Sequence, residues 1–205
     1  MGRKRSTRSL SLQVLFSSKK NEVKVLTKAI RKIPKNVLRT GIFTSGCGKG
    51  KTLQKIGDLN PLGDVLFDLE FILSPDKIAK LMKGFEKKSS VFRSTGGTHS
   101  AGLADRDKIL LFNEDIGRHN AVDKVLGEAL MRKTPLKNKI LLSSGRISSD
   151  ILLKARRTGI AIIISRSAPT NLAIDLAQRL GITIVGFARG RRMNIYTCPF
   201  RIGVY

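Results

Sequence analysis

The 205-residue sequence predicts an α/β protein with a mostly parallel sheet and helices packed on it. Three short apolar segments in the C-terminal half each end in a polar turn, and capped helical patterns lie between them. Strands that alternate with helices in this way pair in parallel. The length is enough for one domain with a real core and an additional N-terminal arm.

The net charge of +24 is the strongest signal in the composition. Residues 1–55 carry fifteen Lys and Arg against the single acid Glu22. Such a charge predicts attraction to phosphates of a nucleotide-like ligand, a nucleic acid or an anionic membrane. The few aromatic residues do not favour stacking on single strands, so nucleic acid is an alternative and not the favoured partner.

The N-terminal part predicts a small basic hairpin, with strands at Leu10–Phe16 and Val23–Leu26. We divide the chain into a basic arm or hairpin subdomain, residues 1–40, and an α/β domain, residues 41–205. The first apolar segment is too short and interrupted for a secretory signal, and no run is long enough to span a membrane. With two distant cysteines, this composition predicts a cytoplasmic protein.

The loop Thr44–Thr52 contains three glycines and Cys47. Lys49 and Lys51 favour the thiolate, so this thiol is a candidate nucleophile or sulfur carrier; the alternative is an ordinary loop cysteine. A nucleotide-binding phosphate loop is not favoured, because Ser45 stands where the first glycine of that motif belongs.

An apolar strand at Ile109–Phe112, expected to be buried on both faces, leads into a helix that Asp115 is expected to cap. Glu114, Arg118 and His119 crowd at this junction. The free amide groups of a helix start can receive an anion, and this mixture of groups also suits proton chemistry; the alternative is a capped helix with a solvated first turn.

His99 follows a paired-glycine turn and is more often a structural residue than a catalyst. Zinc-dependent deamination is excluded, because Ala101 stands where that motif requires glutamate. No metal site is therefore expected.

A helix begins at Ser74–Pro75, and further strands are expected at Ile140–Leu142, Ile160–Ile164 and Ile182–Val185. The turns after parallel strands meet at one rim of the sheet, where ligands of such folds bind. We therefore expect a crevice for a large phosphate-bearing ligand, built from four turns: Glu114–His119, Ser144–Arg146, Ser165–Ser167 and Phe187–Arg192.

Five ordered motifs resemble the formate dehydrogenase accessory sulfurtransferase family, FdhD, over roughly Ile42 to Ile202. They are Thr98–Ala101, Glu114–Lys124, Ser144–Ser148, Ser165–Thr170 and Gly186–Gly190.

The resemblance implies a three-layer α/β/α, cytidine-deaminase-like fold and a homodimer. It implies that Cys47 takes persulfide sulfur from a cysteine desulfurase for the molybdenum bis(guanine dinucleotide) cofactor of formate dehydrogenase. This cofactor would be substrate, with guanosine diphosphate as a mimic and no permanently bound cofactor. The cofactor-contacting stretch of the family falls on Phe187–Arg192.

Three departures stand out. Gly50 replaces the second cysteine of the family's usual C-x-x-C loop, although transfer of a persulfide needs only one nucleophilic sulfur. An N-terminal family region is missing before Cys47, and Cys198 stands where histidine is usual.

The sequence thus predicts an accessory sulfurtransferase with formate dehydrogenase as partner; the alternative is a non-catalytic cofactor- or nucleic-acid-binding protein. Cys47 is the expected sulfur carrier and His119, or less favoured His99, the proton-handling residue. The predicted cofactor-binding residues are Thr98, His99, Arg118, Ser144, Gly145, Arg146, Arg166, Phe187, Ala188, Arg189, Gly190, Arg191 and Arg192.

Overall fold

The computed structural model describes residues 12–17, 22–27, 42–43, 51–52 and 70–203. The chain divides into two compact units, Met1–Thr40 and Gly41–Tyr205. In the first unit, β1 (Leu12–Ser17) and β2 (Glu22–Thr27) pair antiparallel, which confirms the predicted hairpin. In the second, the two-residue strands β3 (Ile42–Phe43) and β4 (Lys51–Thr52) also pair antiparallel.

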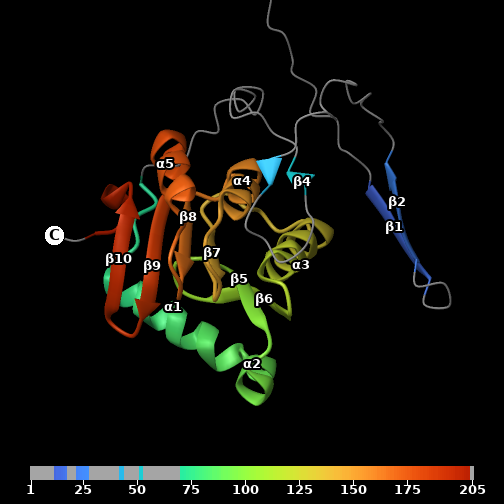
Figure 1. The fold of residues 1–205 in the computed structure, drawn as a ribbon, viewed down its shortest axis with the longest axis horizontal. Coiled ribbons are helices and arrows are strands. Elements are labelled where there is room, and N and C mark those ends of the chain that lie inside the picture. Colours follow the sequence, from blue (N-terminus) through green and yellow to red (C-terminus); the bar gives the residue numbers. More distant parts are fainter. Residues whose placement is uncertain (1–11, 18–21, 28–41, 44–50, 53–69, 204–205) are drawn as a thin grey trace, which may run out of the picture. The chain divides into compact units, whose positions relative to one another are not determined.

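A six-stranded sheet, ordered β10-β9-β8-β7-β5-β6, forms the centre of the second unit (Figure 1). The sheet is mixed: β7–β8 and β8–β9 are parallel, but the other three pairs are antiparallel. The mostly parallel sheet is therefore not confirmed. The strands are β5 (His99–Ala104), β6 (Ile109–Asp115), β7 (Ile140–Ser143), β8 (Ile162–Ser165), β9 (Thr183–Arg189) and β10 (Arg192–Thr197).

Strand direction nevertheless preserves the feature on which the predicted site depends. Because β5 runs antiparallel to both β6 and β7, β6 points the same way as β7, β8 and β9. The carboxyl ends of these four strands therefore lie at one rim of the sheet, together with the start of β5.

The helices begin and end largely where local chemistry predicts. Ser74 Oγ accepts a hydrogen bond from the Lys77 amide at 3.4 Å, and Thr170 Oγ1 accepts one from the Ala173 amide at 3.3 Å. Gly159 and Gly181 end their helices in the left-handed region, which costs glycine little. The helices are α1 (Pro75–Lys88), α2 (Ser90–Thr95), α3 (Arg118–Met131), α4 (Ser149–Thr158) and α5 (Asn171–Leu180), with a 3-10 turn at Pro199–Arg201.

The side chains of alternate residues in the central strands pack into two separate hydrophobic cores. Leu141 and Ile163 pack with α3, α4 and α5, whereas Leu142 and Ile164 pack with α1. This period of two places helices on both faces of the sheet, so the expected three layers are present. In the part of the chain that the structure describes, no helix has the length and apolar character needed to cross a membrane.

Two expectations about the junction after β6 were wrong. The strand lies at the edge of the sheet, with Leu111 its one buried residue, so it is not buried on both faces. Asp115 is the last residue of β6, and Gly117 is the residue that precedes the helix. The Asp115 carboxylate instead accepts hydrogen bonds from the Gly117 amide at 2.9 Å and from Asn120 at 3.1 Å.

Candidate functional site

The rim brings together residues from three separate segments: the start of β5, the start of α3 and the turn after β7. His99 Nδ1 lies 3.3 Å from Ser144 Oγ, which also accepts a hydrogen bond from the Ser100 amide at 2.8 Å. A Cβ added to Gly145 would lie 2.9 Å from Arg118 Cβ and 3.3 Å from His99 Nδ1. We call His99, Arg118, Ser144 and Gly145 the rim cluster.

Buried hydroxyl groups hold the turn after β7 in place. The Ser165 hydroxyl donates to the Gly145 carbonyl at 2.7 Å, and the Gly145 amide donates to Ser143 Oγ at 3.1 Å. The Arg166 amide donates to the Ser143 carbonyl at 3.1 Å, which ties the turn after β8 to the same strand end. The rim cluster thus rests on neighbouring strands and not on a free loop.

Burial and neighbouring positive charges disfavour protonation of His99. Burial lowers the pKa of His99 below its ordinary value of 6.5, and the positive charges of Arg118 and Arg146 lower it further. A neutral imidazole between cationic groups can accept a proton or a hydrogen bond, and an incoming anion would offset the repulsion that protonation creates.

His119 lies on the first turn of α3 and contacts a different group. Its Nε2 is 3.0 Å from the hydroxyl of Ser148, the residue before α4. Burial lowers the pKa of His119, as do Arg118 and Lys154, while Asp150 and Asp123 act in the opposite sense. In both histidines the uncharged form is therefore favoured, but His99 is the one in contact with Ser144.

The predicted arginines differ in their surroundings. Arg118 is buried, Arg146 is exposed, and the Nε of Arg166 forms an ion pair with Glu86 at 3.1 Å. The arginines of the β9–β10 hairpin, Arg189, Arg191 and Arg192, are all exposed.

The hairpin that carries the predicted stretch Phe187–Arg192 starts at the rim and ends beside α1. The Phe187 amide donates to the Ser167 carbonyl at 3.2 Å, which joins the hairpin to the turn after β8. Near the tip, Arg191 pairs with Asp76 at the start of α1 at 3.4 Å. Phe187 is exposed with a positive φ of 50°, whereas its neighbour Ala188 is buried.

Glu114 and Thr98 form a structural group next to the rim cluster. The Glu114 carboxylate accepts hydrogen bonds from the Val91 and Phe92 amides at 3.0 and 2.9 Å and from the Thr98 hydroxyl at 3.2 Å. Burial alone would raise the pKa of Glu114, but these hydrogen bonds lower it below its ordinary value. Glu114 thus caps the start of α2, and Thr98 takes part in that cap.

Of the two cysteines, Cys198 lies within the described residues. Cys47 lies in residues 44–50, outside the described residues. Cys198 is free and 5% exposed, and burial raises the pKa of its thiol although Arg201 acts in the opposite sense. A buried, protonated thiol is a poor nucleophile, so Cys198 is a suitable control for chemistry at Cys47.

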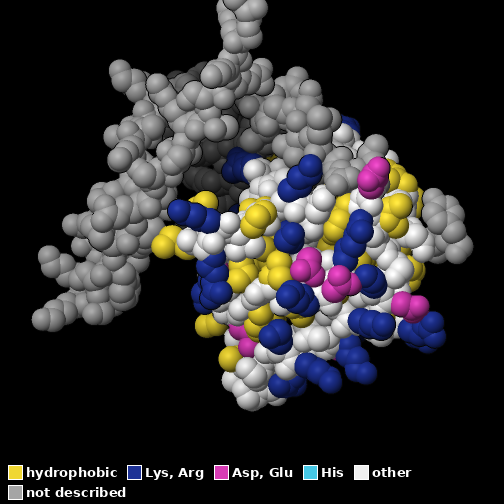
Figure 2. All heavy atoms as spheres, turned by 180° about the vertical axis from the view of Figure 1, so that it is seen from behind, with side chains coloured by type: hydrophobic (Ala, Val, Ile, Leu, Met, Phe, Trp, Pro, Cys, Tyr) yellow, Lys and Arg dark blue, Asp and Glu magenta, His cyan; other side chains and the backbone are white. Residues whose placement is uncertain are grey.

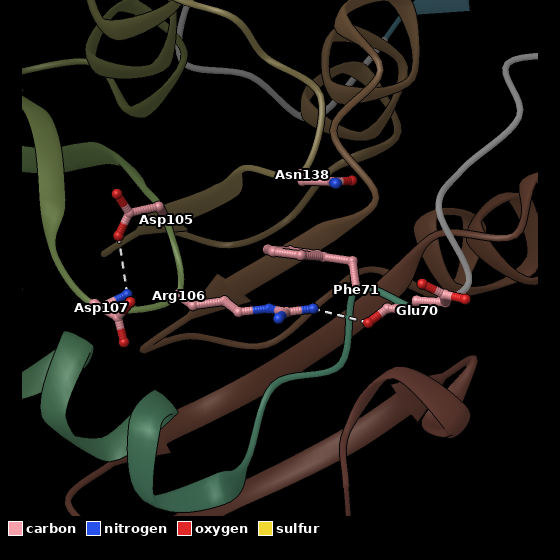
Figure 3. Close-up of a pocket in the computed structure, with 6 residues that line it drawn as sticks. All are labelled: Glu70, Phe71, Asp105, Arg106, Asp107 and Asn138. Carbon is pink, nitrogen blue, oxygen red and sulfur yellow. Dashed lines mark hydrogen bonds between the residues drawn. The ribbon is translucent and has the colours of Figure 1, made fainter.

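A cavity of about 540 Å³ lies at the opposite end of the sheet, around the turn between β5 and β6. Arg106 crosses it, with its guanidinium 5.0 Å from the centre of the Phe71 ring and a hydrogen bond of 2.8 Å to the Glu70 carbonyl (Figure 3). The remaining lining residues are Asp105, Asp107 and Asn138. Since none of the predicted site residues that the structure describes lines this cavity, we place the candidate site at the rim.

Of the residues that support the rim cluster, Ser165 belongs to a predicted turn of the crevice, but sequence reasoning missed Ser100 and Ser143. Both are buried polar residues within strands, and serine is too common for its position to mark a role. Ser148 had a usable signal, because a serine directly before a helical pattern is a typical helix-start residue.

The sequence pattern of the FdhD/NarQ family matches residues 6–203. The sulfur carrier protein FdhD of Bacillus pumilus is 45% identical over 161 residues, covering 78% of this chain and 61% of the relative. The sulfur carrier protein FdhD of Bacillus licheniformis is 39% identical over 188 residues, covering 92% of this chain and 66% of the relative. The chain thus spans about three fifths to two thirds of the length of these curated relatives.

A crystal structure from Desulfotalea psychrophila, of a protein assigned as a formate dehydrogenase accessory protein, is similar to this fold. The TM-score is 0.69 at 30% identity, and the match covers 93% of this chain and 71% of the other. The cytidine-deaminase-like character of the fold stays a prediction.

Proposed function

The chain belongs to the FdhD/NarQ family, and on this basis we propose that it carries sulfur in the maturation of formate dehydrogenase. Its similarity to proteins named sulfur carriers and to a formate dehydrogenase accessory protein supports this function. The acceptor that we propose is the molybdenum bis(guanine dinucleotide) cofactor, bound as substrate at the rim.

The proposed first step uses Cys47 alone. Its thiolate attacks the terminal sulfur of a persulfide on a cysteine desulfurase. A new S–S bond forms on Cys47, the S–S bond of the donor breaks, and the donor leaves as a thiolate. In the onward step a nucleophilic group of the acceptor attacks the outer sulfur: a bond forms between the acceptor and this sulfur, the S–S bond on Cys47 breaks, and Cys47 leaves as a thiolate. Gly50 in place of a second cysteine therefore does not block the cycle.

The single observation that best supports substrate binding at the rim is the rim cluster. Gly145 lets the backbone approach Arg118 and His99 closely, and arginine is the side chain best suited to phosphate oxygens. Neutral His99 can accept a proton there, and the turns after β6, β7, β8 and β9 supply polar groups along the same edge. A guanine dinucleotide, with two phosphates between polar head groups, fits an extended polar rim of this kind.

Sulfur loading tests the chemistry. After incubation with a cysteine desulfurase and cysteine, mass spectrometry should find one extra sulfur on the peptide that contains Cys47 and none on the peptide that contains Cys198. Cys47→Ala should abolish loading, whereas Cys198→Ala should leave it unchanged. Sulfur on Cys198, or none on either cysteine, would contradict the proposal.

Ligand titration tests the rim. Guanosine diphosphate should bind more tightly than adenosine diphosphate, and Arg118→Ala should weaken that binding. Duplex DNA, titrated at two salt concentrations, separates this function from nucleic-acid binding. Tight, steeply salt-dependent DNA binding with no preference for the guanine nucleotide would favour the nucleic-acid alternative.

A further inference from the structure

The outer side of α1 carries a row of lysines. Its inner side, formed by Ile78, Leu81, Met82 and Phe85, is buried in the core. Lys80, Lys83 and Lys87 are exposed and lie three and four residues apart, so they align along the opposite side of the helix. We call these three residues the lysine row; it extends about 10 Å at the helical rise of about 1.5 Å per residue.

Both acidic residues of α1 are matched by arginines from other elements. Asp76 pairs with Arg191 at 3.4 Å, and Glu86 pairs with Arg166 at 3.1 Å. Within the described residues, no carboxylate lies within ion-pair distance of the lysine row. Lys and Arg side chains also dominate the charged surface seen in Figure 2, with few Asp and Glu among them. The row is therefore a positively charged surface with no neutralising partner in this part of the chain.

The same ion pairs connect α1, the helix that carries the lysine row, to the rim. Arg191 belongs to the β9–β10 hairpin, and Arg166 to the turn after β8, both of which are predicted to contact the substrate. Near the other end of α1, Arg93 of α2 donates hydrogen bonds to the Glu86 and Lys87 carbonyls at 3.1 and 2.6 Å. A protein that contacts the lysine row would therefore lie next to the edge at which the proposed cargo is held.

We propose that the lysine row docks an acidic surface of the apo-formate dehydrogenase that receives the cofactor from the rim. This inference rests on the proposed function, in which the recipient must approach the rim and the sulfur donor must approach Cys47. Opposite charges on two protein surfaces accelerate encounter and fix orientation, and loss of such exposed charges lowers the association rate.

The geometry favours a protein over a membrane or a nucleic acid. An amphipathic helix binds a membrane through its apolar side, and that side of α1 is buried in the core. Each lysine can neutralise about one phosphate, so the row alone supplies fewer contacts than the roughly six to ten of a DNA-binding protein with a steep salt dependence.

The test compares two triple variants of the full-length chain with equal change in charge. The first is Lys80→Gln, Lys83→Gln and Lys87→Gln, and glutamine keeps helix propensity close to that of lysine. The matched control is Lys108→Gln, Lys133→Gln and Lys137→Gln, because these exposed lysines lie before β6 and between α3 and β7, at the opposite end of the sheet.

Binding to immobilised apo-formate dehydrogenase is measured at low and high salt. We expect the lysine-row variant to bind about tenfold more weakly at low salt, mainly through slower association, and the control to change less than about twofold. Both variants should load sulfur on Cys47 and bind guanosine diphosphate like the unmodified chain, since neither triple touches those groups.

Equal losses in the two variants would show that net charge alone matters and would overturn the proposal, as would unchanged binding by the lysine-row variant. If the lysine-row variant lost binding only to phosphatidylserine vesicles or duplex DNA, the lysine row would be a phosphate-binding surface, and the proposal would also be overturned. Failure of the unmodified chain to load sulfur or bind guanosine diphosphate would instead count against the proposed function itself.

Discussion

At the scale of single residues, the charge state of His99 should make stability depend on pH. Burial, Arg118 and Arg146 lower the pKa of His99 below its ordinary 6.5, so the unfolded chain binds a proton more readily than the folded one. The resulting stabilisation is present at pH values above the pKa of His99 in the unfolded chain. It is lost as the pH falls towards the lower pKa of His99 in the folded chain. His99→Gln should therefore flatten the loss of unfolding free energy on acidification, measured by urea denaturation above and below 6.5.

Carboxylates titrate at lower pH than His99, so their effect on stability can be separated from that of His99. The hydrogen bond from Lys124 and that from the Gly117 amide lower the pKa of Asp115 to about 2, so the stabilisation from this group disappears only in much stronger acid. His119 also has a lowered pKa and should account for the dependence that remains in His99→Gln. A pH dependence identical to that of the unmodified chain would show that His99 does not contribute.

Gly145 should tolerate no side chain, because its neighbours are fixed. A Cβ there would lie 2.9 Å from Arg118 Cβ, an atom next to the backbone that cannot move aside easily. We expect Gly145→Ala to lower the free energy of unfolding by about 1–3 kcal/mol and to weaken binding of guanosine diphosphate. Gly127→Ala is the control: no atom lies within 4 Å of its added Cβ, and it should gain roughly 0.5–1 kcal/mol. Equal effects of the two substitutions in urea denaturation would contradict this account of the rim cluster.

At the scale of elements, α2 depends on a cap from another segment. Ser89, which precedes it, makes no side-chain cap, while Glu114 accepts the Val91 and Phe92 amides. Glu114→Ala should leave both amides without this acceptor and cost about 1–2 kcal/mol of local stability. Hydrogen exchange should show faster exchange at these two amides, with α1 unchanged. Glu128→Ala, which removes a carboxylate of α3, serves as control and should leave α2 unaffected.

The sequence predicted the alternating helices and strands of the C-terminal half well and strand β5 poorly. Thr170, Gly159 and Gly181 mark helix ends through chemistry local to each position. No local signal marks β5, whose Gly102 is needed for packing: a Cβ there would lie 3.3 Å from the Leu111 carbonyl and from the Phe85 ring. Strand β5 pairs between β6 and β7 because of tertiary contacts, which a pattern along the chain does not contain.

At the scale of the whole molecule, the rim could be predicted although the sheet was not. Its location depends on the direction of β6, β7, β8 and β9, and the two strands that run the other way, β5 and β10, leave that direction unchanged. What lies beneath the rim could not be predicted, because the contact between Gly145 and Arg118 joins residues far apart in sequence.

The two units should make separable contributions to binding. Residues 1–40 carry twelve Lys and Arg against Glu22 alone, whereas every residue of the rim cluster belongs to Gly41–Tyr205. Non-specific attraction to phosphates depends on how many cations meet them, but recognition of one nucleotide depends on fixed geometry. Removal of residues 1–40 should therefore weaken the non-specific attraction to phosphates and leave recognition of the nucleotide unchanged.

Deletion of residues 1–40 should weaken binding to duplex DNA and make it less sensitive to salt. The slope of log K against log salt should fall by about 0.9 for each phosphate contact removed. Affinity for guanosine diphosphate should stay within about twofold, since every residue of the rim cluster belongs to the unit that remains. Fluorescence anisotropy with labelled DNA and calorimetry with the nucleotide measure the two quantities, and circular dichroism confirms folding of the shortened chain. Loss of nucleotide binding in a folded deletion variant would mean that the arm contributes to the site, and the division into two functions would fail.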